Sequence, residues 1–197
     1  MKYLKFGAVI AVFSGLLSIH SMAAAGEPTE QLRATINKFL TILTSTPVAE
    51  LQEKGLPESA RKLVFARFDF SEMTKRSLGS HWKALELKEQ KEFVDALTER
   101  LLFLYGRSVR SSASAKIQFN RETQDGMLAS VQTKVLSEGD ELPIDYQMHD
   151  VNGQWRVYDV VIDHVSLVNN YRAQFDRVIA KSSVQELLKK MKEPNQS

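Results

Sequence analysis

Apolar residues recur every three or four positions in six segments of the chain, and this period predicts an amphipathic helix in each. The segments are residues 29–43, 58–66, 72–78, 88–109, 166–179 and 183–192. Ser71 is expected to cap the third helix, and Ser183 has the spacing of a capping-box residue in the last one. Around Gly55 and Pro57 we expect a loop.

Between residues 116 and 163 the period changes to two. Apolar and polar side chains alternate in residues 116–120, 129–135, 142–149 and 155–163, which predicts strands with one apolar face. Asn152-Gly153 is a strong signal for a hairpin turn before the last strand. The alternation slips around Asp159–Val161, so we expect a bulge or a strand end there. This strand is expected to pass directly into the helix that follows it.

The order of these elements indicates the fold class. Helices come first, about four antiparallel strands follow, and helices end the chain. This order is typical of an α+β domain in which helices pack on one face of a curved sheet. The chain has no internal repeat and no linker rich in proline or glycine. We therefore expect residues 26–197 to form a single domain with a substantial core.

The first 25 residues have the arrangement of a secretory signal peptide. Lys2 and Lys5 precede an apolar run from Phe6 to about Ile19, and Ala23-Ala24-Ala25 follows as a peptidase site. A transmembrane anchor is the weaker interpretation, because the run is shorter than the roughly 20 residues that span a bilayer. We expect cleavage after Ala25 and a soluble, exported product.

Charge and cysteine content exclude several classes of function. The full chain has a formal net charge of +2, and loss of the two leader lysines leaves a neutral mature domain. Neutrality gives little reason to expect nucleic acid or a general attraction to anionic membranes. The chain has no cysteine, which excludes a lipoprotein anchor, disulfides, thiol catalysis and cysteine-based metal binding.

No motif for catalysis or metal binding is found. His81, His149 and His164 lack the spacing of metal ligands, so surface or interface roles are favoured. Asp159, Asp163 and His164 can be imagined as an acid–base set, but strand-edge or helix-entry carboxylates are the better interpretation. The sequence predicts no catalytic residue, no metal site and no cofactor, and it does not favour an enzyme.

Two segments carry a resemblance to a known family. WRVYDVVIDHVSLVNNYRAQFDRVI, residues 155–179, resembles the C-terminal signature of the MlaC family, periplasmic phospholipid carriers also described as a toluene-tolerance auxiliary component of an ABC transporter. ARFDFSEMTKRSLGSHWKALELKEQKEFVDALTERLLFLYG, residues 66–106, resembles the middle of that family's pattern. The resemblance covers about residues 30–180. It implies an NTF2-like cone with an apolar cavity between sheet and helices.

The resemblance also implies a function and a site. The chain is expected to be a monomeric periplasmic carrier that moves phospholipid between an outer-membrane lipoprotein–porin complex and an inner-membrane ABC transporter with an MCE-domain ring, and so maintains outer-membrane lipid asymmetry. The residues expected to line its cavity are Phe39, Leu97, Leu101, Tyr105, Phe119, Val131, Ile144, Tyr146, Met148, Val161, Tyr171 and Phe175. Three alternatives stay open: a carrier of another apolar lipid such as a hopanoid or quinone, an NTF2-like isomerase or dehydratase, and a protein adaptor without a cavity.

Overall fold

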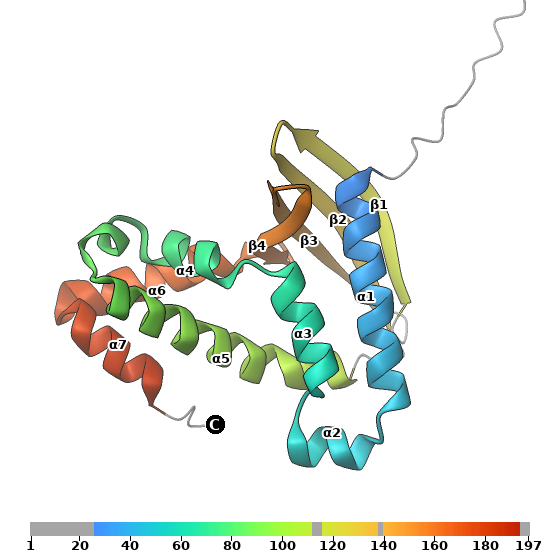
Figure 1. The fold of residues 1–197 in the computed structure, drawn as a ribbon, viewed down its shortest axis with the longest axis horizontal. Coiled ribbons are helices and arrows are strands. Elements are labelled where there is room, and N and C mark those ends of the chain that lie inside the picture. Colours follow the sequence, from blue (N-terminus) through green and yellow to red (C-terminus); the bar gives the residue numbers. More distant parts are fainter. Residues whose placement is uncertain (1–25, 112–115, 138–139, 194–197) are drawn as a thin grey trace, which may run out of the picture.

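The structure is a computed structural model that describes residues 26–111, 116–137 and 140–193 (Figure 1). The helices before the sheet are α1 (Glu27–Ser45), α2 (Val48–Lys54), α3 (Glu58–Arg67), α4 (Phe70–Leu78), the 3-10 helix η1 (Gly79–Ala84) and α5 (Leu87–Ser111). The strands are β1 (Lys116–Asp125), β2 (Leu128–Ser137), β3 (Asp140–Val151), β4 (Gln154–Ile162) and β5 (Val165–Ser166). Two helices follow the sheet, α6 (Leu167–Lys181) and α7 (Val184–Lys192). The predicted α+β class is confirmed.

The helical segments follow the predicted apolar period, with two differences. The loop expected around Gly55 and Pro57 is present, but the short helix α2, which was not predicted, precedes it and buries Leu51. Helix α4 begins earlier than predicted, and its cap is Asp69 rather than Ser71, because the Asp69 carboxylate accepts from the backbone N–H of Glu72. The cap of α7 is as predicted: the Ser183 hydroxyl accepts from the N–H of Glu186.

The sheet is open, has the order β1-β2-β3-β4-β5, and pairs every neighbour antiparallel. Asn152 and Gly153 have φ of 54° and 80°, as a two-residue hairpin turn requires, which confirms that prediction. The sheet differs from the prediction at the end of β4. A second turn, Asp163-His164, leads into the two-residue strand β5, so the chain does not pass directly from β4 into α6.

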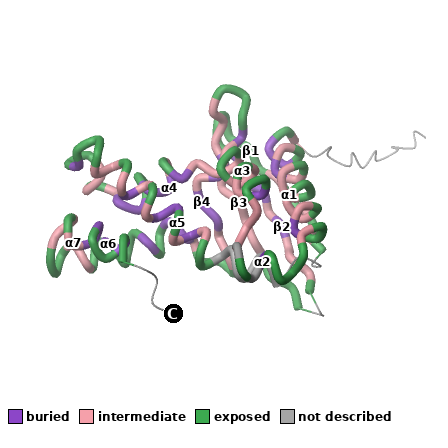
Figure 2. The backbone as a smooth tube through the Cα atoms, turned by 60° about the horizontal axis from the view of Figure 1, so that its bottom comes forward, coloured by how far each residue is buried: buried purple, intermediate pink, exposed green. Residues whose placement is uncertain are grey.

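One continuous core joins the sheet to the helices. We call the inner face the side of the sheet that carries Ala129, Val131, Met148 and Val157, all of them buried. Helix α1 runs beside β1 and β2, whereas α4, α5, α6 and α7 gather beyond β4 (Figure 1). Figure 2 shows buried backbone where α4, α5 and β4 meet. Within the described residues, no helix has the length and apolar character needed to cross a membrane.

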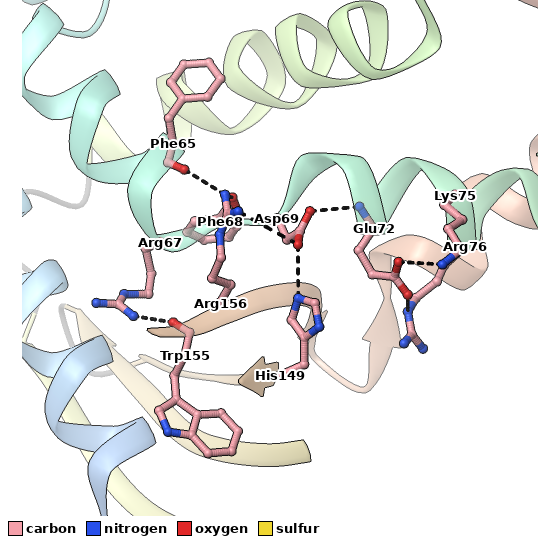
Figure 3. A network of polar contacts seen from close by, with 10 residues as sticks. All are labelled: Phe65, Arg67, Phe68, Asp69, Glu72, Lys75, Arg76, His149, Trp155 and Arg156. Carbon is pink, nitrogen blue, oxygen red and sulfur yellow. Dashed lines mark hydrogen bonds and ion pairs between the residues drawn. The ribbon is translucent and has the colours of Figure 1, made fainter. Parts of the chain in front are cut away.

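The outer edge of β4 is covered by polar groups from α1 and the α3–α4 junction. The backbone N–H of Asp69 donates to the carbonyl of Val157 at 2.8 Å. The side chain of Gln31 accepts from the N–H of Trp155 at 2.9 Å, and the Arg67 guanidinium donates to the Trp155 carbonyl (Figure 3). These bonds satisfy an edge that would otherwise present unpaired backbone groups.

Candidate functional site

The structure places most of the predicted cavity residues in the hydrophobic core or against it. Six of the twelve are buried members of the core: Leu97, Leu101, Val131, Met148, Tyr171 and Phe175. Three more, Phe119, Ile144 and Tyr146, are half-buried and pack against that core. Phe39 is half-buried on α1. Tyr105 belongs to α5, but its side chain lies outside the described residues. Whether these residues line a ligand cavity stays a prediction.

Strand register brings the half-buried residues side by side. Thr133 of β2 pairs with Phe119 on one side and Ile144 on the other, and Val131 pairs with Tyr146. Paired residues of antiparallel strands point to the same face. Phe119 of β1, Val131 of β2, and Ile144 and Tyr146 of β3 therefore form an apolar row across three strands of the inner face.

Val161 does not belong to this row, which corrects the prediction. Tyr146 pairs with Val160, whereas Val161 pairs with Asp145 on the opposite face. The cause is a bulge: Met148 pairs with Val157 and Gln147 with Asp159, so Tyr158 is an extra residue on β4. The bulge shifts the alternation by one residue. Val160 thus takes the inner position that the sequence pattern assigned to Val161.

Tyr146 lies at the centre of the row. Burial raises the pKa of its hydroxyl to about 12. Its side chain is nevertheless only half-buried. Among the described residues the hydroxyl makes no hydrogen bond, although a buried tyrosine usually finds a partner. Tyr146 is thus shielded from bulk water without being fully covered by protein atoms.

Helix α1 stands over the β1 end of the row. The Arg33 guanidinium lies 4.2 Å from the centroid of the Phe119 ring, a cation–π contact that covers the ring with a charged group. One turn further along α1, Ile36 packs against the core. A single helix, α1, therefore covers this end of the inner face, whereas several helices pack against the β4 end.

A separate pocket of about 310 Å³ opens between α3, α4, α5 and β4. Its wall combines aromatic with charged groups: Phe65, Phe68, Phe70, Asp69, Asp95, Glu99 and Arg156. The volume is at the lower end of the range for small-molecule sites, and lipids with two acyl chains are larger than such ligands. Its charged lining also does not suit an acyl chain.

Arg156 and Asp69 hold this pocket together (Figure 3). The Arg156 guanidinium donates to the carbonyls of Phe65 and Phe68 at 3.1 and 2.8 Å. The Asp69 carboxylate caps α4 and lies 3.1 Å from His149 Nε2. The sequence pattern does not reveal this network, because its members are up to 91 residues apart. The available signal was the presence of charged side chains inside the apolar ARFDF motif.

The imagined acid–base set has a structural explanation. Asp159 is buried, and its carboxylate accepts from the Ser166 hydroxyl at 2.5 Å and from the Val168 N–H at 3.1 Å. Asp159 therefore fixes the start of α6. Asp163 and His164 form the exposed turn before β5. Of the other histidines, His81 lies 3.2 Å from Asp176. No cluster of three potential metal ligands is found in the described residues.

The two signature segments pack against each other. Helix α4 ends at Gly79, whose φ of 55° favours glycine. A Cβ atom at this position would lie 2.9 Å from the guanidinium of Arg172 on α6. Gly79 is therefore favoured by its backbone conformation, and the Arg172 side chain of α6 lies directly against it.

The fold and the apolar inner face define a class: α+β domains in which helices cover an open antiparallel sheet. A family model described as MlaC protein matches residues 33–193, so the chain belongs to the MlaC family. The resemblance of the two signature segments is confirmed.

One related sequence and one solved structure show which proteins the chain is similar to. The "Intermembrane phospholipid transport system binding protein MlaC" of Haemophilus influenzae is 21% identical over 122 residues, which are 59% of this chain and 57% of that protein. The chain thus matches a little over half the length of this relative. A phospholipid-binding protein from Ralstonia solanacearum, solved in complex with a phospholipid, has the same fold, with a TM-score of 0.77 and 21% identity. The match covers 85% of this chain and 96% of that one.

Proposed function

We propose that this chain is a periplasmic carrier that binds a glycerophospholipid and moves it between an outer-membrane lipoprotein–porin complex and an inner-membrane ABC transporter. Membership of the MlaC family supports the proposal, as do the transport system named for the Haemophilus relative and the phospholipid in the Ralstonia structure. The leader predicted over residues 1–25 lies outside the described residues and supports the periplasmic location.

The apolar inner face carries the proposal. On β3 and β4 it holds Ile144, Tyr146, Met148, Val157 and Val160. An isomerase or dehydratase would need a carboxylate or histidine there, whereas Asp159 is engaged at the start of α6. In our proposal the acyl chains lie against this face and the headgroup stays outside.

Transfer requires a partner that lowers the affinity of the carrier for its bound lipid. Burying two chains of ~14 methylenes contributes about 0.8 kcal/mol per CH₂, or more than ~20 kcal/mol before costs. Noncovalent affinity saturates near ~20 kcal/mol, so such a complex would release its lipid very slowly on its own. Release then depends on a docked complex that reshapes the site or offers a competing one. No covalent chemistry on the lipid is involved.

Native mass spectrometry tests the cargo. Protein purified without detergent is expected to carry glycerophospholipid in a near-stoichiometric amount, and delipidated protein should take it up from vesicles. Extraction and lipid analysis separate phospholipid from a hopanoid or quinone. Apo protein that also fails to accept lipid would remove the carrier hypothesis and favour an adaptor.

A further inference from the structure

The first turn of α1 is capped by a residue from the sheet. Gly26 occupies the N-cap position and has no side chain to offer. Instead, the carboxylate of Glu122 on β1 accepts from the backbone N–H of Thr29 at 2.8 Å. A negative group at this place compensates the partial positive charge of the helix end. Glu122 therefore links the start of α1 to the edge strand of the sheet.

The backbone of Gly26 lies directly against this carboxylate. Its φ of −71° and ψ of 174° suit any residue, so its conformation does not require glycine. A Cβ atom at position 26 would lie 1.9 Å from Oε1 of Glu122, so a larger residue would have to displace this carboxylate. The nitrogen of Gly26 is about 2.5 Å from that Cβ position, which puts it within about 4.4 Å of Oε1.

Position 26 is also where the predicted leader ends. Hydrolysis of the Ala25–Gly26 amide bond by a signal peptidase consumes one water, leaves a carboxylate on Ala25 and leaves an amine on Gly26. The amine is protonated at neutral pH, since α-amino groups have pKa values of about 7.7–8.0. An ammonium group at a helix start is unfavourable unless a carboxylate lies beside it.

We propose that processing after Ala25 creates an ion pair between the new α-ammonium group of Gly26 and Glu122, which fastens α1 to β1 in the mature protein. The inference rests on the predicted leader. In the precursor an uncharged amide occupies the same place, so the contact gains its charge only on maturation. Because α1 stands over Phe119 at the β1 end of the inner face, maturation also fixes this wall of the proposed lipid site.

A two-by-two comparison tests the ion pair. Protein exported with its own leader is first examined by intact mass, which should show Gly26 as the N-terminus. The α-amine is then selectively acetylated, and the acetyl group stands in for the carbonyl of Ala25. Acetylation should lower the Tm of the unaltered protein by about 1–3 °C at low salt. In Glu122→Gln, which keeps an oxygen for the Thr29 N–H, acetylation should change the Tm far less.

Controls separate this contact from general charge effects. Asp125→Asn on the same strand should retain the full acetylation effect. Glu27 and Glu30 in the first turn of α1 are further carboxylates near the amine, and both are present in every arm. The effect should be present near pH 6–7 and fade above about pH 9, since the folded amine has the raised pKa and loses its charge there.

Two results would overturn the proposal. Equal acetylation effects in the Glu122 and Glu122→Gln backgrounds would show that no ion pair forms. A mature terminus other than Gly26 would refute the processing step. Neither result bears on the lipid measurement, which needs only the folded chain.

Discussion

Tyr146 and Gln147 are neighbours in β3 that face opposite sides of the sheet. Tyr146 belongs to the inner apolar row, whereas the side-chain amide of Gln147 donates to the Ser130 hydroxyl at 3.1 Å on the other face. Tyr146→Asp would place a carboxylate without a partner in an apolar site, which costs several kcal/mol or displaces the lipid. We expect it to reduce lipid per protein severalfold, measured after detergent-free purification.

Two variants serve as controls for this expectation. Gln147→Asp introduces the same charge on the opposite face and should leave lipid content nearly unchanged. Tyr146→Phe removes only a hydroxyl that has no hydrogen-bond partner among the described residues and should also retain lipid. Equal lipid content in folded Tyr146→Asp and Gln147→Asp proteins would contradict the assignment of faces.

The same tyrosine makes stability depend on alkaline pH. Burial raises the pKa of the Tyr146 hydroxyl to about 12 from an ordinary value of 10. The unfolded chain therefore loses this proton first, and the stabilising contribution is present below pH ~10 and lost as the pH rises toward 12. Phenolate absorbance should therefore contain a late step that belongs to Tyr146. Tyr146→Phe should remove this late step from the titration curve and reduce the loss of folding stability at alkaline pH. If the variant instead loses a titration step near pH 10, the Tyr146 hydroxyl is not buried.

Arg67 is the clamp that joins α1, α3 and the edge of β4. Burial, with a smaller contribution from Arg156, lowers the pKa of its guanidinium. The group donates to Gln31 at 2.8 Å, to Thr35 at 3.0 Å and to the Trp155 carbonyl. Arg67→Met would remove all three of these bonds and leave Gln31 only its bond from the Trp155 N–H. We expect a loss of about 2–4 kcal/mol in the free energy of unfolding by urea titration.

Arg61 in the same helix provides the matched control. It pairs with Glu99 at 2.8 Å on the exposed side of α3. Arg61→Met should cost less than about 1 kcal/mol, since exposed ion pairs contribute little. Arg67→Lys should fall between the two, because an ammonium group cannot reproduce the planar fork of the guanidinium. Similar losses for Arg61→Met and Arg67→Met would show that the clamp is not structural.

The elements that the sequence predicts are those with a long one-sided apolar pattern. The helix pattern of residues 88–109 and the alternation in β2 and β3 suffice because one core holds one face of each. Helix α2 escapes prediction because it is only seven residues long, and Leu51 is the one buried residue among its positions of described burial, which sets no period. The sequence shows that the alternation of apolar and polar residues breaks somewhere in β4. The position of the bulge at Tyr158 is set by the pairing of β4 with β3. This position determines that Val160, and not Val161, lies on the inner face.

The sequence pattern could not predict contacts between side chains that are distant in the chain. Gln31 meets Trp155 across 124 residues, and Glu122 meets Thr29 across 93. Side chains of this kind look like ordinary surface positions until the fold brings them together. Asp159 is the opposite case: its sequence context suggested acid–base chemistry, but its carboxylate accepts a hydrogen bond from the first turn of α6. Periodicity therefore placed apolar residues in the core well and the polar contacts poorly.

For the whole molecule, charge balance bears on how a carrier finds its partners. The mature chain is expected to be neutral, so long-range attraction to anionic bilayers is weak. Local patches meeting partner proteins are then the better means of recognition. Our candidates are the polar face around Asn169 and Arg172 and the lysines of α7. Met191, which lies between these lysines in the sequence, is buried and belongs to the core.

We therefore predict weak binding to bare anionic vesicles at physiological salt and lipid exchange that accelerates strongly when the ABC-transporter complex is present. Transfer between protein-free vesicles is compared with transfer to proteoliposomes that hold the complex. Lys190→Glu on the exposed face of α7 should slow only the second reaction, whereas Lys62→Glu on α3 is the charge-matched control. If bare vesicles exchange lipid just as fast, the membrane surface itself is the partner, and docking through a protein patch is wrong.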